Sequence, residues 1–381
     1  MNRLLARMDK PLFIIMLILF ITGLIMIFSA STITSFMRFQ ASPYSFFIKQ
    51  GLFLIIGLLT FFFIIKIPLK NYKNYIGILM GGIIFSLFFL FIYATTINYS
   101  LSWYRIGGFF SIQPSEFAKV ILILFLAIYY NTNKTELNKY RVVLLPLGLA
   151  LLIVSLVLFQ PDLGTAVILA SLTLFLFLAI PVDRTLKSKI INLLFGMVIV
   201  MFLVIIASGK TFLSSTQRER LYFQNPCQRY ETSGYQVCNG YIAINNGGLF
   251  GVGLGKSTQK YLYLPEAHTD FIFAIVIEEL GLIVGLVILF LLLVVLYRIL
   301  IIARRSHHLR DAVIAYGVFF YILLHIIVNL TGLLGLLPLT GVPLPFFSYG
   351  GSYTLNLFIA LALVQRVNIE TYYHNKNKSL R

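Results

Sequence analysis

Long apolar runs alternate with short polar segments along nearly the whole chain. Each run covers about 20 residues, the length that an α-helix needs to cross the hydrocarbon core of a bilayer. Ten such runs lie near residues 11–31, 46–66, 74–94, 115–131, 142–159, 164–181, 190–208, 270–297, 312–333 and 350–366. The pattern therefore predicts an all-α integral membrane protein, with residues 1–381 forming a single bundle of about ten transmembrane helices.

The runs 142–159 and 164–181 are separated only by the turn Gln160-Pro161-Asp162-Leu163-Gly164. Pro161 and Gly164 break the helical pattern, so we expect two helices here and not one long one. The distinction matters because merging the two would reverse the membrane orientation of every later segment.

The basic residues predict how the bundle is oriented. Only 11% of the residues are charged, against about 25% in a soluble domain, yet the net charge is +17. One alternate set of loops, which includes both chain ends, holds 20 of the 30 Lys and Arg residues; six of the others lie in the long loop 209–269. Since basic residues concentrate on the cytoplasmic side, we expect both termini inside and this loop outside. Their confinement to short loops, with no nucleic-acid-binding motif, argues against a nucleic acid partner.

Ionisable residues near the outer membrane boundary are the first candidates for a functional site, because charge at such depth is costly. Glu266, His268 and Asp270 lie together just before the apolar run 270–297. Asp270 opens that predicted helix, where the N-terminal dipole would stabilise its charge. A simple helix cap is one interpretation of Asp270, but the crowding of three ionisable groups favours a functional site.

A second group lies at the start of the run 115–131. Glu116 and Lys119 are three residues apart and should share a helix face. They form either an internal ion pair that makes both charges tolerable in the bilayer, or a site in which Lys119 binds phosphate or pairs with Asp270. Asp162, in the turn at 160–164, is either a turn residue or a ligand.

The stretch 337–352 is irregular. Its prolines and glycines cannot continue a helix, and irregular backbone at membrane depth is tolerated where it lines a cavity. We therefore expect a groove there. The Gly-rich stretch 251–257 is not a phosphate loop, because Phe250 stands where the first glycine of that motif must be. No Cys or His spacing indicates a structural metal.

The only two cysteines, Cys227 and Cys238, both fall in the outer loop. Disulfides form and persist outside the cytoplasm. Closing a loop of about 12 residues would contribute roughly 3 kcal/mol in the chain-entropy model. Spacing alone does not fix the Cα separation, so a disulfide and two free thiols both stay open.

Four stretches, 113–119, 160–164, 264–281 and 337–352, together resemble the SEDS family (shape, elongation, division and sporulation), which includes FtsW and RodA. The similarity covers nearly the whole chain in the same order. It implies a peptidoglycan glycosyltransferase that polymerises lipid II at the outer face of a bacterial cytoplasmic membrane. Asp270 matches the family's essential aspartate and would be the catalytic base.

The resemblance also implies how the substrate is bound. Lys119 and Arg105 would stabilise the lipid diphosphate leaving group, with or without a divalent cation such as Mg²⁺ or Mn²⁺. Ser102 stands where relatives often have Arg, which weakens the assignment of phosphate contacts to that loop. The other residues expected to contact the substrate are Glu116, Asp162, Glu266, His268 and Ser348.

Within the family, the stretch 253–270 looks more like the division enzyme, whereas the brief N-terminus and the stretch 338–341 would also suit the elongation enzyme. Members work with a class B penicillin-binding protein, a transpeptidase, and with other divisome or elongasome proteins. The alternative functions are a lipid II flippase and a non-catalytic scaffold. A flippase needs charges along a path across the bilayer, whereas the inner halves of the helices here are nearly free of charge.

Overall fold

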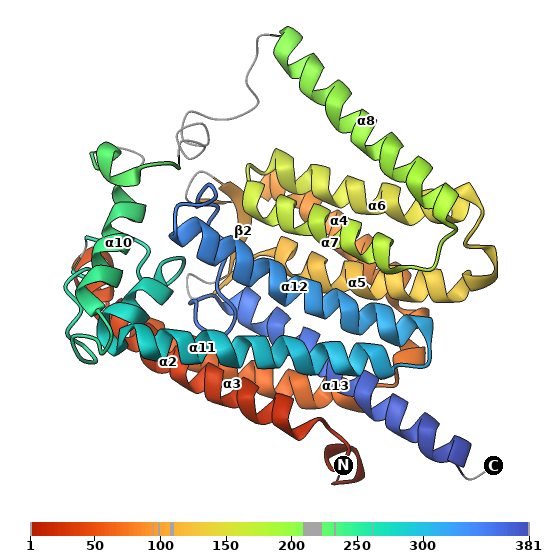
Figure 1. Ribbon diagram of the computed structural model, residues 1–381, viewed down its shortest axis with the longest axis horizontal. Coiled ribbons are helices and arrows are strands. Elements are labelled where there is room, and N and C mark those ends of the chain that lie inside the picture. The colour runs from red at the N-terminus through yellow and green to blue at the C-terminus, as the bar shows by residue number, and fades with distance from the viewer. Residues whose placement is uncertain are drawn as a thin grey trace.

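Helices that run side by side form the body of the molecule in this computed structural model (Figure 1). The structure describes residues 2–93, 95–97, 100–106, 110–208, 223–231, 234–261 and 263–379. Each of the ten expected apolar runs coincides with a helix in this part of the chain: α2 (Lys10–Phe39), α3 (Ser45–Lys66), α4 (Ile76–Tyr93), α5 (Pro114–Thr132), α6 (Tyr140–Phe159), α7 (Leu163–Ala179), α8 (Arg184–Ser208), α11 (Ile272–Arg305), α12 (Leu309–Leu333) and α13 (Gly351–Ser379). The predicted helical fold class is confirmed.

The number of membrane crossings is a separate matter. Seven of the described helices are long and apolar enough to cross a membrane: α2, α3, α4, α5, α6, α11 and α12. Helix α7 is apolar but shorter, at 17 residues. The count of ten crossings, which adds α7, α8 and α13, stays a prediction. The turn at 160–164 does separate α6 from α7, as Pro161 and Gly164 indicated.

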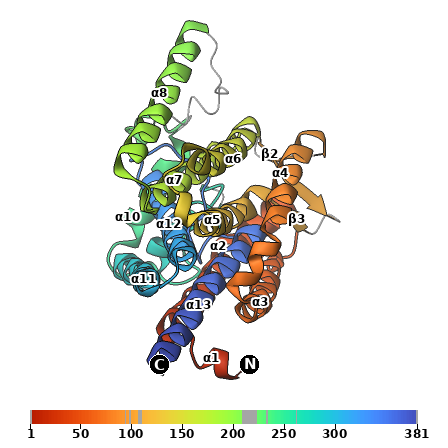
Figure 2. The same cartoon turned by 90° about the vertical axis from the view of Figure 1, so that its right-hand side faces the viewer.

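Helix α5 lies at the centre of the bundle. In its most apolar window 72% of the residues are buried, a larger share than in any other candidate span. It packs against α4, α6, α7, α12 and α13, and Figure 2 shows it among them. A charged residue on α5 therefore faces protein and not lipid, which is the environment in which charges within a bundle are found.

The two ends of the bundle differ in construction. One end, called the α10 end below, carries α10 (Tyr235–Gly247) and the loop 337–350, while both chain termini lie at the opposite end (Figure 1). Ion pairs join segments at the terminal end: Asp9 with Arg298, and Arg310 with both Asp311 and Glu370. An even number of crossings agrees with termini that share one end.

Several short elements were not predicted. A three-stranded antiparallel sheet joins β1 (Thr95–Ile97), β2 (Ser100–Ile106) and β3 (Phe110–Ile112) between α4 and α5. Short helices also occur: α1 (Asn2–Leu5), η1 (Leu69–Asn74), η2 (Lys134–Glu136) and η3 (Pro226–Arg229). Residues 209–222 of the predicted long outer loop lie outside the described residues, so the extent of the loop stays a prediction.

Helix α11 is interrupted at Gly281, whose φ is +87°. A Cβ at this position would lie 2.3 Å from Leu249 O, so only glycine fits. The carbonyls of Glu278 and Glu279 accept hydrogen bonds from Val252 N and Gly253 N, each at 2.9 Å. The Gly-rich stretch that superficially resembled a phosphate loop is thus docked along α11.

Candidate functional site

Asp270 lies at the α10 end, two residues before α11 begins. The simpler of the two interpretations, a helix cap, does not hold, because Phe271 occupies the N-cap position of α11. Asp270 is half-buried, whereas Phe271 is fully buried. The backbone on one side of the carboxylate is therefore fixed by packing, while Asp270 as a whole is only partly buried.

The Pro- and Gly-rich loop 337–350 lies against Asp270. Gly341 has a φ of +73°, and a Cβ there would be 3.4 Å from Asp270 Oδ2. Ser348 joins the loop to the Asp270 segment: its Oγ accepts from Leu344 N and donates to Thr269 O, both at 2.7 Å. Tyr349 N adds a bond to His268 O at 2.9 Å. Ser348 thus holds two backbones together, and a direct contact with substrate stays a prediction.

Helix α12 contributes two polar side chains that the sequence analysis missed. His325 Nδ1 lies 3.2 Å from Pro343 O, and Asn329 Nδ2 donates to both Val342 O and Asp270 O at 2.9 Å. The two residues are four apart on one helix face, within an otherwise apolar run. That spacing was the signal available in the sequence.

Lys119 forms the predicted ion pair with Glu116, and both side chains are buried. The Nζ to Oε1 distance is 2.7 Å, and Nζ is also 3.0 Å from His325 Nε2. Pro343 O can only accept, so His325 Nδ1 carries the proton and Nε2 accepts from Lys119. A neutral histidine thus connects the buried ion pair to the irregular loop. The predicted contacts of Lys119 with Asp270 or a diphosphate stay predictions.

Asp162 caps α7, where its Oδ1 accepts from Thr165 N at 3.1 Å, and its Oδ2 accepts from Gln113 Nε2 at 2.9 Å. Gln113 N in turn donates to Ser352 Oγ at 3.0 Å. The starts of α5, α7 and α13 are therefore joined at the α10 end. Asp162 has a structural role here, and its predicted substrate contact is not tested by these bonds. Arg105 is exposed on β2.

Glu266 and His268 line the turn that precedes Asp270. Glu266 Oε2 accepts from Thr269 Oγ1 at 2.7 Å, which shapes the turn. His268 is buried, with its ring 4.6 Å from that of Phe46 and 5.8 Å from that of Tyr349. Burial, with a smaller contribution from the positive charge of Arg38, lowers the pKa of His268 from 6.5 to about 4. His268 is therefore neutral at physiological pH.

This shift predicts a pH dependence of stability. Below pH 6.5 the unfolded chain protonates His268 while the folded chain does not, so the free energy of unfolding falls as the pH drops toward 4. The loss across this window is about 3 kcal/mol. Thermal unfolding in detergent, followed from pH 7.5 to 4.5, should show a steeper decline for the wild type than for His268→Phe. Equal slopes would contradict the prediction.

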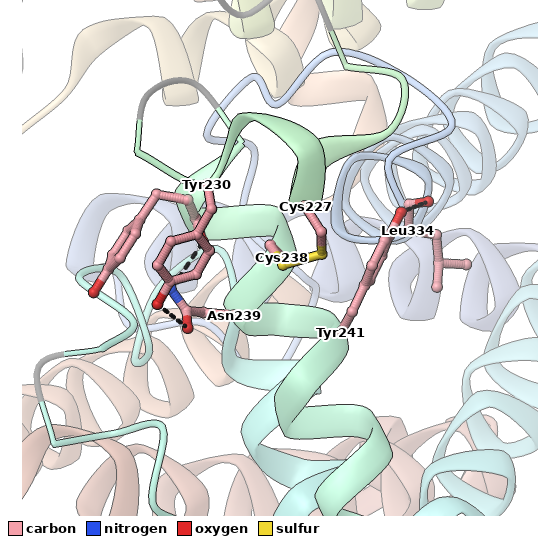
Figure 3. Close-up of a disulfide and its surroundings, with 7 residues drawn as sticks. Cys227, Tyr230, Cys238, Asn239, Tyr241 and Leu334 are labelled. Carbon is pink, nitrogen blue, oxygen red and sulfur yellow. Dashed lines mark hydrogen bonds between the residues drawn. A yellow bond between two sulfur atoms is a disulfide. The ribbon is translucent and has the colours of Figure 1, made fainter.

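A disulfide anchors the helix beside Asp270. Cys227 and Cys238 are bonded, which decides between the two alternatives left open by the sequence (Figure 3). The bond ties η3 to α10, and Tyr241 of α10 donates to Leu334 O at 2.7 Å. A Cβ on Gly240 would lie 3.2 Å from the ring of Phe271, so α10 packs directly on the residue after Asp270.

Removing this disulfide should loosen α10. The Cys227→Ser/Cys238→Ser variant loses a link that closes a loop of about 12 residues, which contributes roughly 3 kcal/mol in the chain-entropy model. Amide hydrogen exchange of residues 235–247 should become faster. An energy of that size corresponds to an increase of roughly 100-fold in the exchange rate. Reduced wild-type protein is the control and should behave alike. Unchanged exchange in both samples would show that packing alone holds α10.

Two further carboxylates at this end serve the structure. Glu278 accepts from Thr258 N at 3.1 Å, and Glu279 pairs with Lys260 at 2.9 Å. Both carboxylates are fully buried. In the described part of the chain, no three His, Cys, Asp or Glu side chains come together in a way that would hold a metal ion. The described residues therefore include no cluster of three such side chains for a divalent cation, and no step is derived through one.

Comparison with known proteins identifies relatives over nearly the full length. The family model described as "Cell cycle protein" (FtsW/RodA/SpoVE) matches residues 9–373. A protein of Wigglesworthia glossinidia brevipalpis named "Probable peptidoglycan glycosyltransferase FtsW" is 38% identical over 95% of this chain and 93% of its own. "Stage V sporulation protein E" of Bacillus subtilis is 35% identical over 94% of this chain and 96% of its own.

Solved structures share the fold. A chain from a study of a peptidoglycan synthase complex that couples polymerization to crosslinking has a TM-score of 0.75 and 23% identity. The match covers 96% of this chain and 98% of that one. The rod shape determining protein RodA of Thermus thermophilus has a TM-score of 0.67 and 25% identity, with the same coverage.

Proposed function

The chain belongs to the FtsW/RodA/SpoVE family, and from this premise we propose that it is a peptidoglycan glycosyltransferase that polymerises lipid II into glycan strands. One observation carries the proposal. Asp270, a half-buried carboxylate, stands at one end of an apolar bundle and is covered by an irregular loop whose Gly341 approaches its Oδ2. Relatives at 34–38% identity over most of the chain bear the name of this activity.

Asp270 is the general base of the proposed reaction. Its carboxylate takes the proton from the 4-hydroxyl of the acceptor sugar, and that oxygen attacks the anomeric carbon of the donor sugar. The bond from the anomeric carbon to the diphosphate oxygen breaks, and the lipid diphosphate leaves. The half-exposed position suits this role, because the base must contact the acceptor and later release its proton.

The leaving diphosphate needs positive charge nearby. Lys119 supplies a buried cation below the loop, connected to it through His325. Arg105 supplies an exposed one on β2. Both belong to segments at the α10 end, and a cation in a site that excludes water stabilises developing negative charge better than one in bulk solvent. The remaining substrate contacts that we propose are Glu116, Asp162, Glu266, His268 and Ser348.

The buried charges support polymerisation over transport. In the described helices they lie near helix ends: Glu116 and Lys119 fall in the first two turns of α5, and Glu278 and Glu279 follow closely after the start of α11. Asp9 caps α2, Asp311 lies in the first turn of α12, and Arg366 donates to Ile65 O at the end of α3. A flippase would need polar groups that continue along a path between these ends. A non-catalytic scaffold would not need a carboxylate such as Asp270 placed against the loop 337–350.

The protein is a multi-pass membrane protein, and we propose its orientation in the membrane. The α10 end faces outward and both termini face the cytoplasm, in agreement with the 20 basic residues on the terminal side. This orientation places the site where lipid II is polymerised and the disulfide outside the cytoplasm. A reporter fused after Arg381 that is active only outside the cell would overturn it.

A class B penicillin-binding protein is the proposed partner, because the transpeptidase must receive the strand that this chain makes. The name FtsW, which the relative from Wigglesworthia glossinidia brevipalpis bears, favours a role in division over elongation. Depletion should then give filamentous cells, since elongation continues without septation, whereas rounded cells would assign the chain to elongation. Full activity without any partner would contradict an obligatory complex.

The test of the proposed function is direct. Purified protein, alone and with its co-purified transpeptidase, is incubated with labelled lipid II, and products are separated on a gel. A ladder of glycan polymer is the expected result. Transfer of lipid II across vesicles without any polymer would favour the flippase instead.

A further inference from the structure

We propose that Asn329 is the positioning residue of Asp270, fastening the backbone that carries the carboxylate to the irregular loop that covers it. The inference rests on the proposed function and adds a residue to it. It depends on a single side-chain amide that lies between two segments some 70 residues apart in the sequence.

The hydrogen bonds of Asn329 fix its orientation. Both hydrogens of its amide are used, one for Asp270 O and one for Val342 O, each at 2.9 Å. Both partners are carbonyls, which only accept, so the NH₂ group and not Oδ1 must face them. The side chain is 5% exposed, and the described residues offer Oδ1 no hydrogen-bond partner. Both hydrogen bonds of this side chain are therefore donated by its NH₂ group.

The loop needs such donors because of its composition. Its prolines lack an N–H, and its irregular path leaves carbonyls that no helix satisfies. Helix α12 provides donors for two successive carbonyls: Asn329 for Val342 and His325 for Pro343. Only Asn329 also reaches the backbone of the proposed base. Ser348 and Tyr349 bond the loop to residues 269 and 268, and Asn329 adds a bond at Asp270 itself.

The backbone of Asp270 is fixed at two points, its own carbonyl and the following residue. Its carbonyl is bound by Asn329, and the next residue, Phe271, is buried and donates to Glu266 O at 3.1 Å. Gly341, the neighbour of Val342, lies close to Asp270 Oδ2, since a Cβ there would be 3.4 Å from that oxygen. Losing the tie would let the loop and the carboxylate move relative to each other. A displacement of about 1 Å in a catalytic group can cost about 100-fold in rate.

The first experiment measures polymerisation kinetics of Asn329→Ala. We expect kcat to fall about 100-fold while KM for lipid II changes less than about threefold, since a misplaced base weakens the chemical step more than binding. The matched control is Gln365→Ala. Gln365 is a buried amide that also makes two backbone hydrogen bonds, to Asp9 N at 2.8 Å and Asp9 O at 3.0 Å, but at the terminal end. The Gln365→Ala variant should lose about as much stability as Asn329→Ala but keep the wild-type kcat.

Asn329→Asp distinguishes lost donors from lost shape. The substitution keeps the volume of the side chain but places carboxylate oxygens against two carbonyls. Protonation returns one O–H donor, so the ratio of variant to wild-type activity should rise as the pH falls from 8 to 6. A purely structural role predicts a flat ratio.

The second experiment does not depend on catalysis. The only two cysteines are bonded to each other, so Asp270→Cys introduces the single free thiol of the chain. Adding Asn329→Ala should speed alkylation of that thiol about tenfold, because hydrogen bonds that hold the segment closed are lost. Adding Gln365→Ala should leave the rate unchanged.

The outcomes separate the two claims. If kcat and the alkylation rate are both unchanged in Asn329→Ala, the positioning role is overturned. If the wild type makes no polymer, or Asp270→Asn stays active, the proposed function or its base assignment fails, while the alkylation rates still decide whether Asn329 holds the segment.

Discussion

Asp270→Asn should reduce lipid II polymerisation to background while the protein folds and expresses normally. The amide keeps the shape of the carboxylate but cannot accept the proton of the sugar hydroxyl. A general base contributes about 10²- to 10⁴-fold to rate, so the loss should be at least 100-fold. The residue is half-buried and does not cap α11, so its neutralisation removes no helix cap.

The measurement is the initial rate of glycan polymer formation at saturating lipid II, together with the melting temperature. Glu136→Gln is the matched control, because it also neutralises a carboxylate, here an exposed one paired with Lys139 at the terminal end. Its rate should equal that of the wild type. A tenth or more of the wild-type rate in Asp270→Asn would exclude Asp270 as the base.

Lys119→Met should have the second large effect, on both stability and activity. The substitution leaves the Glu116 carboxylate buried without its cation, which is expected to cost about 3–5 kcal/mol. Lys119 is 1% exposed and Glu116 3% exposed, so water cannot replace the lost partner. His325 Nε2 also loses the donor that lies 3.0 Å away.

The double variant Glu116→Gln/Lys119→Met separates the two possible roles of Lys119. It removes both charges, so most of the stability should return, as measured by thermal unfolding in detergent. If Lys119 also stabilises the leaving diphosphate, the double variant stays about 100-fold slow although it is folded, the size of effect seen when one electrostatic donor is removed from an active site. Lys119→Arg should keep part of the activity. Wild-type activity in the double variant would leave Lys119 with a structural role alone.

The sequence by itself determined the positions of the helices and the contacts within each. Every apolar run became a helix in the described structure because a helix in a bilayer satisfies its backbone internally, so the signal lies within each run. The pair Glu116 and Lys119 was predictable for the same reason, since residues three apart meet on one helix face whatever surrounds them. Pro161 and Gly164 likewise marked a real break.

The tertiary structure decided what surrounds Asp270. The loop that covers it begins about 70 residues later, and the donors that hold the loop, His325 and Asn329, come from a helix that the sequence presents as apolar. The carbonyls of an irregular backbone have no partner within their own segment. They accept hydrogen bonds from side chains that the tertiary fold places beside them. The spacing of His325 and Asn329 marks a polar face on α12, but it does not say which carbonyls that face will meet. The disulfide was open for the same reason, because its formation depends on how η3 and α10 fold and not on the spacing of two cysteines.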